Sequence, residues 1–318
     1  MSGVSMKLPL IDLSNLGEND SPRWESTKIQ IREALQEYGC FEATFSNIPL
    51  ELRKSIGDGI QQILDLPLAI KELNKNSHRP LHGYVGHNHS GPLIESIGID
   101  GALSPHVVDT FTNLMWPDQG NPTFSKDLQL YCKKLSEMDK IVRRMVLESL
   151  GLEKYIDEHF NSTDYLFRFQ KYDPPRTPHS TLALRDHIDK NFITTIHEFS
   201  HVKGLQILTK DGKTWIPGDT TSLDSFVVLV ATCLQAWTNG RLHAPIHKVV
   251  LSGDETRYTS GMFIVAKEDG CVIKTPEELV DEDHPLLYKP FDYYKFNDFT
   301  LTDAGRASID ALKEYCGA

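Results

Sequence analysis

Residues 186–201 read DHIDKNFITTIHEFSH and contain two metal-binding patterns. The last five residues match the H-E-x-x-H pattern of zinc proteases, with histidines at His197 and His201, whereas His187 and Asp189 form an H-x-D pair. The zinc pattern works on a helix, which places residues i and i+4 on one face, whereas an H-x-D pair can share the face of a strand. The secondary structure of this stretch therefore decides which pattern forms the active site and which fold class carries it.

The residues between the two patterns favour a strand. Residues 193–196 (ITTI) are β-branched throughout, which costs a helix on the order of 2 kcal/mol relative to good helix formers. The longer zinc pattern would also require a third histidine at position 207, where the chain has Ile207. We therefore expect His197 and His201 to be polar positions on or beside a strand. A zinc hydrolase that uses them together with Glu198 is the alternative hypothesis.

On a strand, His187 and Asp189 would point to the same face, so that one imidazole and one carboxylate converge. A second histidine would complete a 2-His-1-carboxylate site, which suits Fe(II) and leaves coordination positions free. His243 directly precedes Ala244-Pro245, a poor setting for a strand interior, whereas His247 begins the run HKVV. We therefore choose His247 as the third ligand and expect His243 to be a solvent-facing loop residue.

A possible carboxylate anchor follows ten residues after His247. Arg257 and Thr259 would share one face of a strand, where a guanidinium fork and a hydroxyl can hold one end of a dicarboxylate. By itself such an arginine usually indicates a surface ion pair. The pattern becomes informative here because Arg257 follows the proposed metal ligand His247 by ten residues.

The rest of the chain divides into a helical front and a β-rich remainder. Many short strands follow Tyr165 without helices between them, which predicts a sandwich or barrel rather than a parallel sheet. Residues 1–163 should form a helical region that contributes to a substrate pocket, and residues 164–318 a β core with a C-terminal helix, together as one compact unit. Helices are predicted to begin at Ser21-Pro22 (ending at Gly39), at Pro49, at Ser104-Pro105 and at about Ser125 (ending at Gly151).

Composition excludes several classes of partner. The chain of 318 residues has 33 Lys and Arg against 44 Asp and Glu, and this net charge of −11 disfavours a nucleic-acid or anionic-membrane surface. No signal peptide and no run of 18 apolar residues is visible, and the five cysteines contain no C-x-x-C pair. We expect a cytoplasmic protein without a nucleic-acid, membrane or obligate protein partner.

Taken together, these spacings resemble those of a known family. With H-x-D, a histidine 58 residues after the aspartate and R-x-T ten residues further on, the chain resembles the plant 2-oxoglutarate/Fe(II)-dependent dioxygenases. PLIDLS, EYGCFEA, FRFQKY, GLQIL with DGKTWIP, and NGR resemble landmarks of that family in the right order. More narrowly, HGYVG, IESIGID, GRLHAP and DEDHPLLYKPFDYYKF resemble the AOP-like branch, which includes dioxygenases that modify glucosinolate side chains.

The resemblance implies a mixed α and β fold, with a double-stranded β-helix (jelly roll) core and N-terminal helices packed around it. It implies Fe(II) bound by His187, Asp189 and His247, and 2-oxoglutarate as the cosubstrate. The residues that would hold 2-oxoglutarate are Arg257, Thr259, Tyr172 and Gln170. Gln170 and Thr259 replace the commoner Asn and Ser but keep the polar functions.

The resemblance also implies the reaction. A small plant specialised metabolite would be oxidised with O2 as co-reactant and ascorbate as reductant, producing succinate and CO2. Hydroxylation is the expected outcome, with desaturation, ring closure or dealkylation as alternatives, and Asp189 predicts no halogenation. A non-catalytic jelly-roll binding protein is a further alternative. The loop at 82–99 should lie near the metal, and Tyr84, Phe169 and Phe263 should line the pocket.

Overall fold

The computed structural model describes residues 7–87, 91–177, 181–267, 271–308 and 310–318. Its helices are α1 (Pro22–Glu37), α2 (Leu50–Leu64), α3 (Leu68–Lys71), α4 (Pro105–Met115), α5 (Pro122–Ser149), α6 (Ile156–Asn161), α7 (Thr232–Trp237), α8 (Tyr293–Leu301), α9 (Asp303–Ala307) and α10 (Ala311–Cys316). Short 3-10 helices are η1 (Glu72–Asn74), η2 (Pro80–His82), η3 (Glu153–Tyr155) and η4 (Glu277–Leu279). Among the helices described here, none is both long and apolar enough to cross a membrane.

The strands form two main sheets. The larger sheet contains β1 (Leu10–Asp12), β2 (Cys40–Thr44), β3 (Ile94–Asp100), β4 (Thr163–Tyr172), β6 (Ile193–Glu198), β9 (Ser225–Val230) and β11 (Arg257–Ala266). The smaller sheet contains β5 (Leu182–His187), β7 (Leu205–Leu208), β8 (Trp215–Pro217) and β10 (His247–Val250), and a third sheet pairs β12 (Val272–Ile273) with β13 (Phe291–Asp292). The strand orders are β1-β2-β9-β6-β11-β4-β3 and β5-β10-β7-β8, with antiparallel pairing except between β1 and β2.

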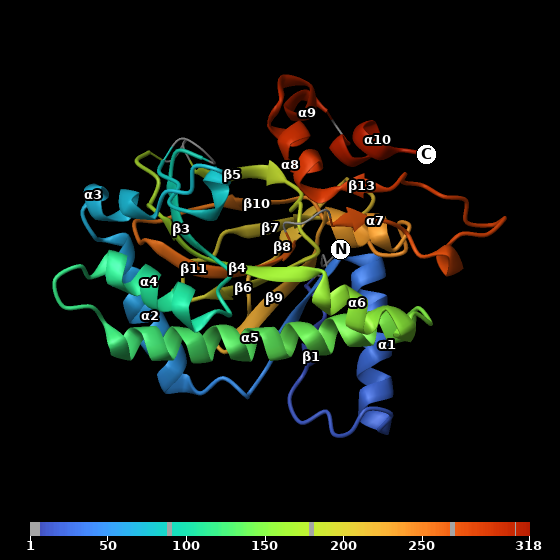
Figure 1. The fold of residues 1–318 in the computed structure, drawn as a ribbon, viewed down its shortest axis with the longest axis horizontal. Coiled ribbons are helices and arrows are strands. Elements are labelled where there is room, and N and C mark those ends of the chain that lie inside the picture. Colours follow the sequence, from blue (N-terminus) through green and yellow to red (C-terminus); the bar gives the residue numbers. More distant parts are fainter. Residues whose placement is uncertain (1–6, 88–90, 178–180, 268–270, 309) are drawn as a thin grey trace, which may run out of the picture.

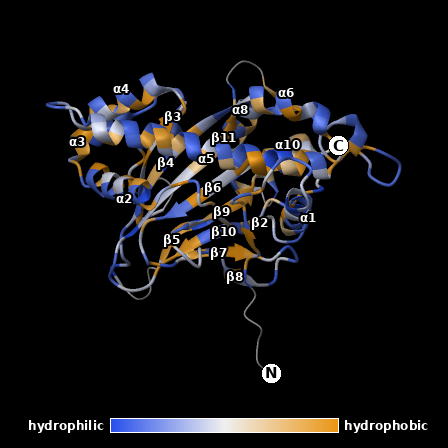
Figure 2. Ribbon diagram, turned by 90° about the horizontal axis from the view of Figure 1, so that it is seen from below, coloured by the Kyte–Doolittle hydropathy of each residue, from blue (hydrophilic) through white to orange (hydrophobic). Residues whose placement is uncertain are grey.

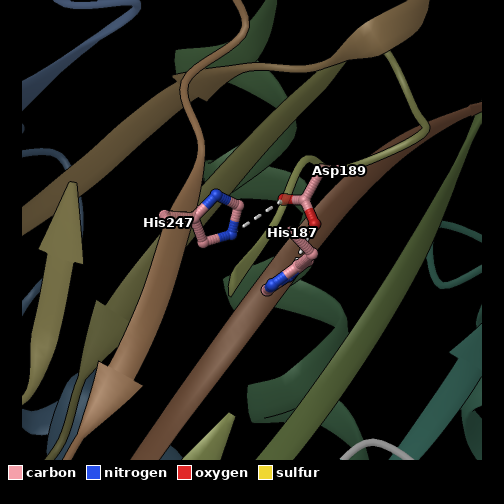
Figure 3. Close-up of side chains that lie close together, drawn as sticks. All are labelled: His187, Asp189 and His247. Atoms are coloured by element: carbon pink, nitrogen blue, oxygen red, sulfur yellow. Dashed lines mark ion pairs between the residues drawn. The ribbon is translucent and has the colours of Figure 1, made fainter. Parts of the chain in front are cut away.

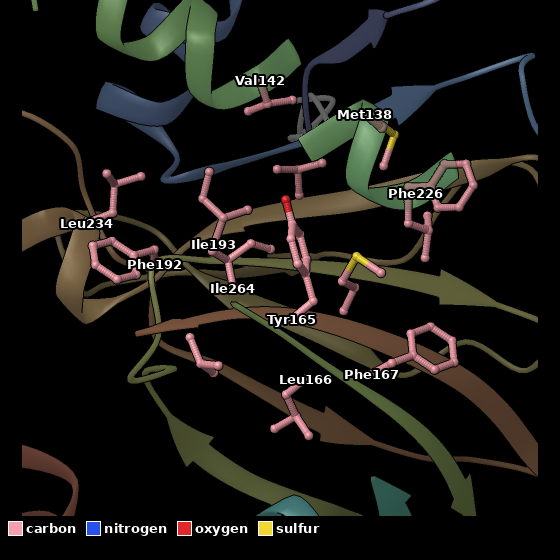
Figure 4. Close-up of a cluster of buried hydrophobic side chains, with 14 of the residues drawn as sticks. Met138, Val142, Tyr165, Leu166, Phe167, Phe192, Ile193, Phe226, Leu234 and Ile264 are labelled. Atoms are coloured by element: carbon pink, nitrogen blue, oxygen red, sulfur yellow. The ribbon is translucent and has the colours of Figure 1, made fainter. Parts of the chain in front are cut away.

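Two apolar layers hold the sheets and helices together. Figures 1 and 2 show α5 on one side of the larger sheet and the smaller sheet on the other. The larger layer joins one face of the seven-stranded sheet to the helices, and Figure 4 shows Met138 and Val142 of α5 opposite Ile193 and Phe167. The smaller layer lies between the two main sheets and includes, from both of them, Cys40, Tyr172, Ala183, Leu205, Ile207, Val227, Leu229 and Val249. This arrangement confirms the predicted mixed fold with an antiparallel β core.

The predicted helix starts agree with the capping geometry. The Ser21 hydroxyl accepts a hydrogen bond from the Trp24 N–H at the start of α1, and Gly39, with φ of +71°, follows its end. The longest helix begins at Pro122 rather than near Ser125, because the Asn121 side chain caps it by accepting from the Phe124 N–H.

The prediction of a helical front was incomplete. The first 163 residues contribute three strands, β1, β2 and β3, to the seven-stranded sheet. The first four residues of β2 and the first six of β3 are all buried, so neither strand has the alternation of apolar and polar residues that reveals a half-exposed strand. The predicted C-terminal helix is also divided into α8, α9 and α10.

Candidate active site

Three potential metal ligands meet at one end of the smaller sheet (Figure 3). His187 is the last residue of β5, His247 is the first residue of β10, and the two are register partners with ring centroids 4.2 Å apart. The carboxylate of Asp189 lies 3.5 Å from Nε2 of His187 and 3.9 Å from Nε2 of His247. No other three His, Cys, Asp or Glu side chains within the described part of the chain approach each other as closely.

Asp189 lies two residues beyond the end of β5, not on the strand as the sequence argument assumed. Its position is maintained by hydrogen bonds from α7 and β6 instead of by strand alternation. The backbone N–H and hydroxyl of Thr232 both donate to the Asp189 carbonyl, and the Thr194 hydroxyl donates to the carboxylate at 2.6 Å. The side chain therefore converges on the histidines because its backbone is anchored in the connection between β5 and β6.

The histidine rings are oriented by backbone carbonyls. Nδ1 of His187 donates to the Arg185 carbonyl at 2.9 Å, and Nδ1 of His247 donates to the Pro245 carbonyl at 3.2 Å. Each ring therefore presents the lone pair of Nε2 toward Asp189, which is the tautomer a metal ion requires.

The charge states of the group also suit a metal ion. Burial, together with the nearby His187, lowers the pKa of His247 to about 4, so that its imidazole is neutral near pH 7. Burial alone would raise the pKa of Asp189, but attraction by His247 and hydrogen bonds from its neighbours hold it well below the usual range. A neutral imidazole and an ionised carboxylate are both ready to bind a cation without releasing a proton.

A second polar group lies where β11 pairs with β4. Arg257 is the register partner of Tyr172, and Thr259 is the register partner of Gln170. The Thr259 hydroxyl donates to Oε1 of Gln170 at 3.0 Å, and the Arg257 guanidinium lies 5.2 Å from the centre of the Tyr172 ring. The four predicted cosubstrate residues therefore form one continuous patch.

The guanidinium of Arg257 is buried and not part of a surface ion pair. Nη2 of Arg257 lies 2.6 Å from Oε1 of Glu198 and 3.5 Å from Oδ1 of Asp219. Its Nε is buried and has no hydrogen-bond partner within the described residues. An unpaired buried donor beside the Thr259 hydroxyl fits an incoming carboxylate.

The HEFSH segment does not form a zinc site. His197 and Glu198 lie on β6 and point to opposite faces, while His201 lies beyond the strand and is exposed. Nε2 of His197 donates to the Leu223 carbonyl at 2.8 Å, and its Nδ1 accepts from the Tyr131 hydroxyl at 2.6 Å. The zinc-hydrolase alternative is therefore wrong, because the segment is a strand and its side chains diverge.

The three predicted pocket residues have different surroundings. Phe263 shares a face of β11 with Arg257 and Thr259 and is half-buried. Phe169 lies on the opposite face of β4 from Gln170 and packs against aromatic rings of α4 and α5, so it belongs to the core.

Tyr84 and His243 are both held by hydrogen bonds. The hydroxyl of Tyr84 hydrogen-bonds the carboxylate of Glu95 at 3.0 Å, and both side chains are buried. His243 lies in a loop as predicted but is half-buried, because its backbone contacts the end of α1 through a hydrogen bond to the Leu35 carbonyl. The loop predicted at 82–99 is wrong from Ile94 onward, where strand β3 begins, and its residues 88–90 lie outside the described residues.

Glu198 and Asp219 are the site residues that sequence analysis missed. The sequence singles out Glu198 only as part of the zinc pattern, and it gives no signal for Asp219. Glu198 is the register partner of Thr259 and therefore faces the same side as Arg257. Its pairing with the arginine depends on a register between distant strands, which no local pattern in the sequence records.

Comparisons with known proteins agree with this geometry. Residues 163–266 match the model of the 2OG-Fe(II) oxygenase superfamily, and residues 8–96 match that of the non-haem dioxygenase in morphine synthesis N-terminal region. The probable 2-oxoglutarate-dependent dioxygenase AOP1.2 of Arabidopsis thaliana is 43% identical over 98% of this chain and 96% of its own length.

Solved structures show the same fold. The rice dioxygenase for auxin oxidation superposes with a TM-score of 0.82 at 27% identity, covering 98% of this chain and 100% of that one. The Arabidopsis thaliana dioxygenase for auxin oxidation 1, in its binary complex with 2-oxoglutarate, has a TM-score of 0.78 at 25% identity, covering 88% of this chain and 100% of that one.

Proposed function

Since this chain belongs to the 2OG-Fe(II) oxygenase superfamily, as an AOP-like plant dioxygenase, we propose that it hydroxylates a small specialised plant metabolite. The observation that carries this proposal is the convergence of His187, Asp189 and His247 beside the polar patch of β4 and β11. The enzyme uses Fe(II), 2-oxoglutarate and O2. Hydroxylation converts substrate, 2-oxoglutarate and O2 into hydroxylated product, succinate and CO2.

We assign the iron to His187, Asp189 and His247. Two imidazole nitrogens and one carboxylate oxygen are the donors that suit non-haem Fe(II), and all three lie within 4.8 Å of one another. When bound, iron and 2-oxoglutarate supply the oxidation chemistry. With Asp189 present, a halide has no vacant protein-ligand position to occupy, so halogenation is not expected.

We assign the remote carboxylate of 2-oxoglutarate to Arg257 and Thr259. Arg257 retains a buried Nε donor, and the hydroxyl of Thr259 lies on the same face. Tyr172 lies beside the guanidinium, and the Thr259 hydroxyl, which donates a hydrogen bond to Oε1 of Gln170 in this structure, would donate to the carboxylate instead when 2-oxoglutarate binds. Arg257, Thr259 and Tyr172 are buried, and a charge-assisted hydrogen bond is strong in such surroundings.

Loss of a ligand should abolish the reaction. We expect purified protein to form succinate only when Fe(II), 2-oxoglutarate and O2 are all present, with ascorbate as reductant. The His187→Ala and Asp189→Ala variants should lose both Fe(II) binding and succinate formation, whereas the matched His201→Ala variant should keep both. Succinate formation that survives in either ligand variant would remove this assignment.

The outcome of oxidation is read from the product. A plant metabolite extract incubated with the enzyme should yield a product that has gained one oxygen atom. A loss of two hydrogen atoms would indicate desaturation or ring closure, and a loss of a methylene unit would indicate demethylation. A protein that binds 2-oxoglutarate but never consumes it would instead be a binding protein.

The proposal places the enzyme in the cytoplasm. All five cysteines are free thiols in the structure, which fits a reducing compartment. A fluorescent fusion of the full chain would test this location, and accumulation in an organelle or outside the cell would contradict it.

A further inference from the structure

Two buried carboxylates share the guanidinium to which we assign 2-oxoglutarate. Nη2 of Arg257 lies 2.6 Å from Oε1 of Glu198 and 3.5 Å from Oδ1 of Asp219, so both oxygens approach one nitrogen. The side chains of Glu198 and Asp219, the acidic pair, are only 1% and 10% exposed. They are also near enough to each other for a hydrogen bond when one of them carries a proton. Two acidic groups thus compete for the positive charge that should hold the cosubstrate.

The two carboxylates differ in how firmly their negative charge is held. Oε2 of Glu198 accepts a hydrogen bond from the ammonium of Lys203 at 3.0 Å, in addition to the short contact with Arg257. Oδ1 of Asp219 accepts from the backbone N–H groups of Gly204 and Leu205, both at 2.9 Å, and its contact with a cation is the longer one. Burial and the charge of Glu198 accordingly raise the pKa of Asp219 above its usual range. Asp219 is therefore the member of the pair that is protonated more easily.

The charges of this cluster balance before the cosubstrate binds. Among the described residues, the cations in contact with the acidic pair are Arg257 of β11 and Lys203 of the connection between β6 and β7. Tyr172 of β4, whose ring lies beside the guanidinium, is neutral near pH 7 because burial raises its pKa. Two positive charges therefore face the two carboxylates. The remote carboxylate of 2-oxoglutarate would add a negative charge that no cation of the cluster compensates.

A proton on the acidic pair removes this excess charge. Carboxylates held close together in a buried site repel one another, and such a pair commonly shares one proton. Lys203 is 48% exposed, so that water and salt screen its charge and weaken its compensation of a further anion. Glu198 keeps the short contacts with both cations, which leaves the proton to Asp219. The protonated Asp219 would donate a hydrogen bond to Glu198 and leave the guanidinium to Glu198 and the cosubstrate.

We propose that Asp219 takes up a proton when the remote carboxylate of 2-oxoglutarate binds at Arg257, and that the acidic pair thereby makes the affinity for 2-oxoglutarate depend on pH. The inference rests on the proposed function, because it uses the assignment of that carboxylate to Arg257. Asp219 acts as a positioning residue, since it contacts the guanidinium and not the reacting atoms. Because the protonated pair binds the anion more tightly, affinity is highest at low pH. It falls as the pH rises from the pKa of Asp219 in the free enzyme to its higher pKa in the complex.

Calorimetry counts the proton. The full chain, loaded with Fe(II) under nitrogen, is titrated with 2-oxoglutarate at neutral pH in buffers that differ in their enthalpy of ionisation, and the difference in heat gives the number of protons exchanged. We expect the uptake of about half a proton or more per 2-oxoglutarate. The matched ligand 2-oxopentanoate has the same keto acid but a methyl group in place of the remote carboxylate, and it should bind without this uptake. The comparison separates the charge that reaches Arg257 from any proton exchange at the iron.

Variants assign the proton to the residue. Asp219→Asn imitates the protonated side chain, because an amide carries no charge and can donate to Glu198. It should take up no proton, and at about pH 8 it should bind 2-oxoglutarate about threefold to tenfold more tightly than the wild type, with a smaller difference at about pH 6. A side chain with only a structural role would not tighten binding when it is replaced. The matched variant Asp281→Asn, at an exposed aspartate that pairs with His284, should behave like the wild type.

The possible failures are distinguishable. A wild type that does not bind 2-oxoglutarate in the presence of Fe(II) overturns the proposed function. A wild type that binds 2-oxoglutarate without taking up a proton, or that takes up as much with 2-oxopentanoate, overturns only the proton coupling. Uptake that persists in Asp219→Asn assigns the proton to another group and also overturns the coupling. If Asp219→Asn does not fold, which its thermal melting shows, the comparison of the two keto acids in the wild type decides.

Discussion

Glu198 lies at the centre of a buried polar network behind the proposed cosubstrate anchor. Its carboxylate receives hydrogen bonds from Arg257 at 2.6 Å, from the Thr220 hydroxyl at 2.7 Å and from Lys203 at 3.0 Å. Burial would raise the pKa of Glu198, but the charge of Arg257 and these donors lower it to about 2. Burial and the charge of Glu198 raise the pKa of Asp219, so Asp219 takes up a proton before Glu198 does as the pH falls.

Removing the charge of Glu198 should destabilise the protein. In Glu198→Gln the buried guanidinium of Arg257 loses its ionised partner, and we expect the free energy of unfolding to fall by about 3 kcal/mol. Urea denaturation at neutral pH measures this change. The matched variant Glu278→Gln breaks a surface pair with Lys154 and should leave the unfolding curve unchanged. Equal curves for Glu198→Gln and the wild type would contradict the role of the network.

His197 couples the stability of the fold to pH. Burial lowers its pKa from 6.5 to about 4, because the imidazole lies in the core between α5 and β6. The unfolded chain therefore binds a proton at a higher pH than the folded chain does. Stability from this residue is complete above pH 6.5 and decreases as the pH falls toward 4, by about 3 kcal/mol in total.

Urea denaturation at several pH values between 7 and 4 measures this dependence. The His197→Gln variant, which keeps a polar side chain but cannot titrate, should show a smaller loss of stability over that range than the wild type does. His201→Gln, at an exposed position of the same segment, should behave like the wild type. A variant at position 197 with an unchanged pH profile would contradict the assignment.

At the scale of elements, β4 separates two environments. Its pairing with β11 directs Gln170 and Tyr172 toward the proposed cosubstrate site, while Phe167 and Phe169 face the helices. The Phe169 ring packs against Phe111 of α4 and is fully buried. One strand thus supplies both the core and the proposed site.

Substitutions on the core face should therefore lower stability, whereas substitutions on the face of the proposed site should mainly weaken binding. Phe169→Ala leaves a cavity under the helices and should lower the free energy of unfolding by about 3 to 5 kcal/mol. Phe263→Ala, at a half-buried position on the site face of β11, should cost less stability and should weaken binding of the apolar part of the substrate. Thermal melting measures the loss of stability, and calorimetric titration with small-molecule ligands measures the loss of binding. A larger loss of stability in Phe263→Ala together with weaker binding in Phe169→Ala alone would contradict the assignment of faces.

Helix ends and most strands were predictable at this scale because they depend on local chemistry. Ser21 and Gly39 begin and end α1 through interactions within a few residues, and the β-branched run at 193–196 excludes a helix. The buried strands β2 and β3 were not predicted, since a short strand covered on both faces has no periodicity of its own.

At the scale of the whole molecule, we propose that residues 1–163 and 164–318 form one folding unit. The strands β2 and β3 come from the first segment and pair with β9 and β4 of the second. The α5 helix, also from the first segment, covers the outer face of the larger sheet through the apolar cluster in Figure 4. A boundary between the segments therefore crosses both a sheet and a core.

A fragment of residues 164–318 should not fold alone. It would expose the unpaired edges of β9 and β4 and the apolar face that α5 covers, so we expect aggregation or a disordered chain. Far-UV circular dichroism and size-exclusion chromatography of the fragment and the full chain measure this difference. A fragment that is monomeric and unfolds cooperatively would show two independent domains instead.

The sequence by itself determined that residues 193–196 form a strand, that His187, Asp189 and His247 are the candidate ligands, and that Arg257 and Thr259 share a strand face. The strands follow from backbone preferences and alternation along a few residues. The convergence of Asp189 on the histidines does not, because this residue lies beyond β5 and is held by Thr232 and Thr194. Only the tertiary structure decided that Glu198 partners Arg257, that Phe169 belongs to the core and that Asp219 approaches the same guanidinium as Glu198. The physical reason is that burial and charge pairing depend on the register between strands far apart in the chain.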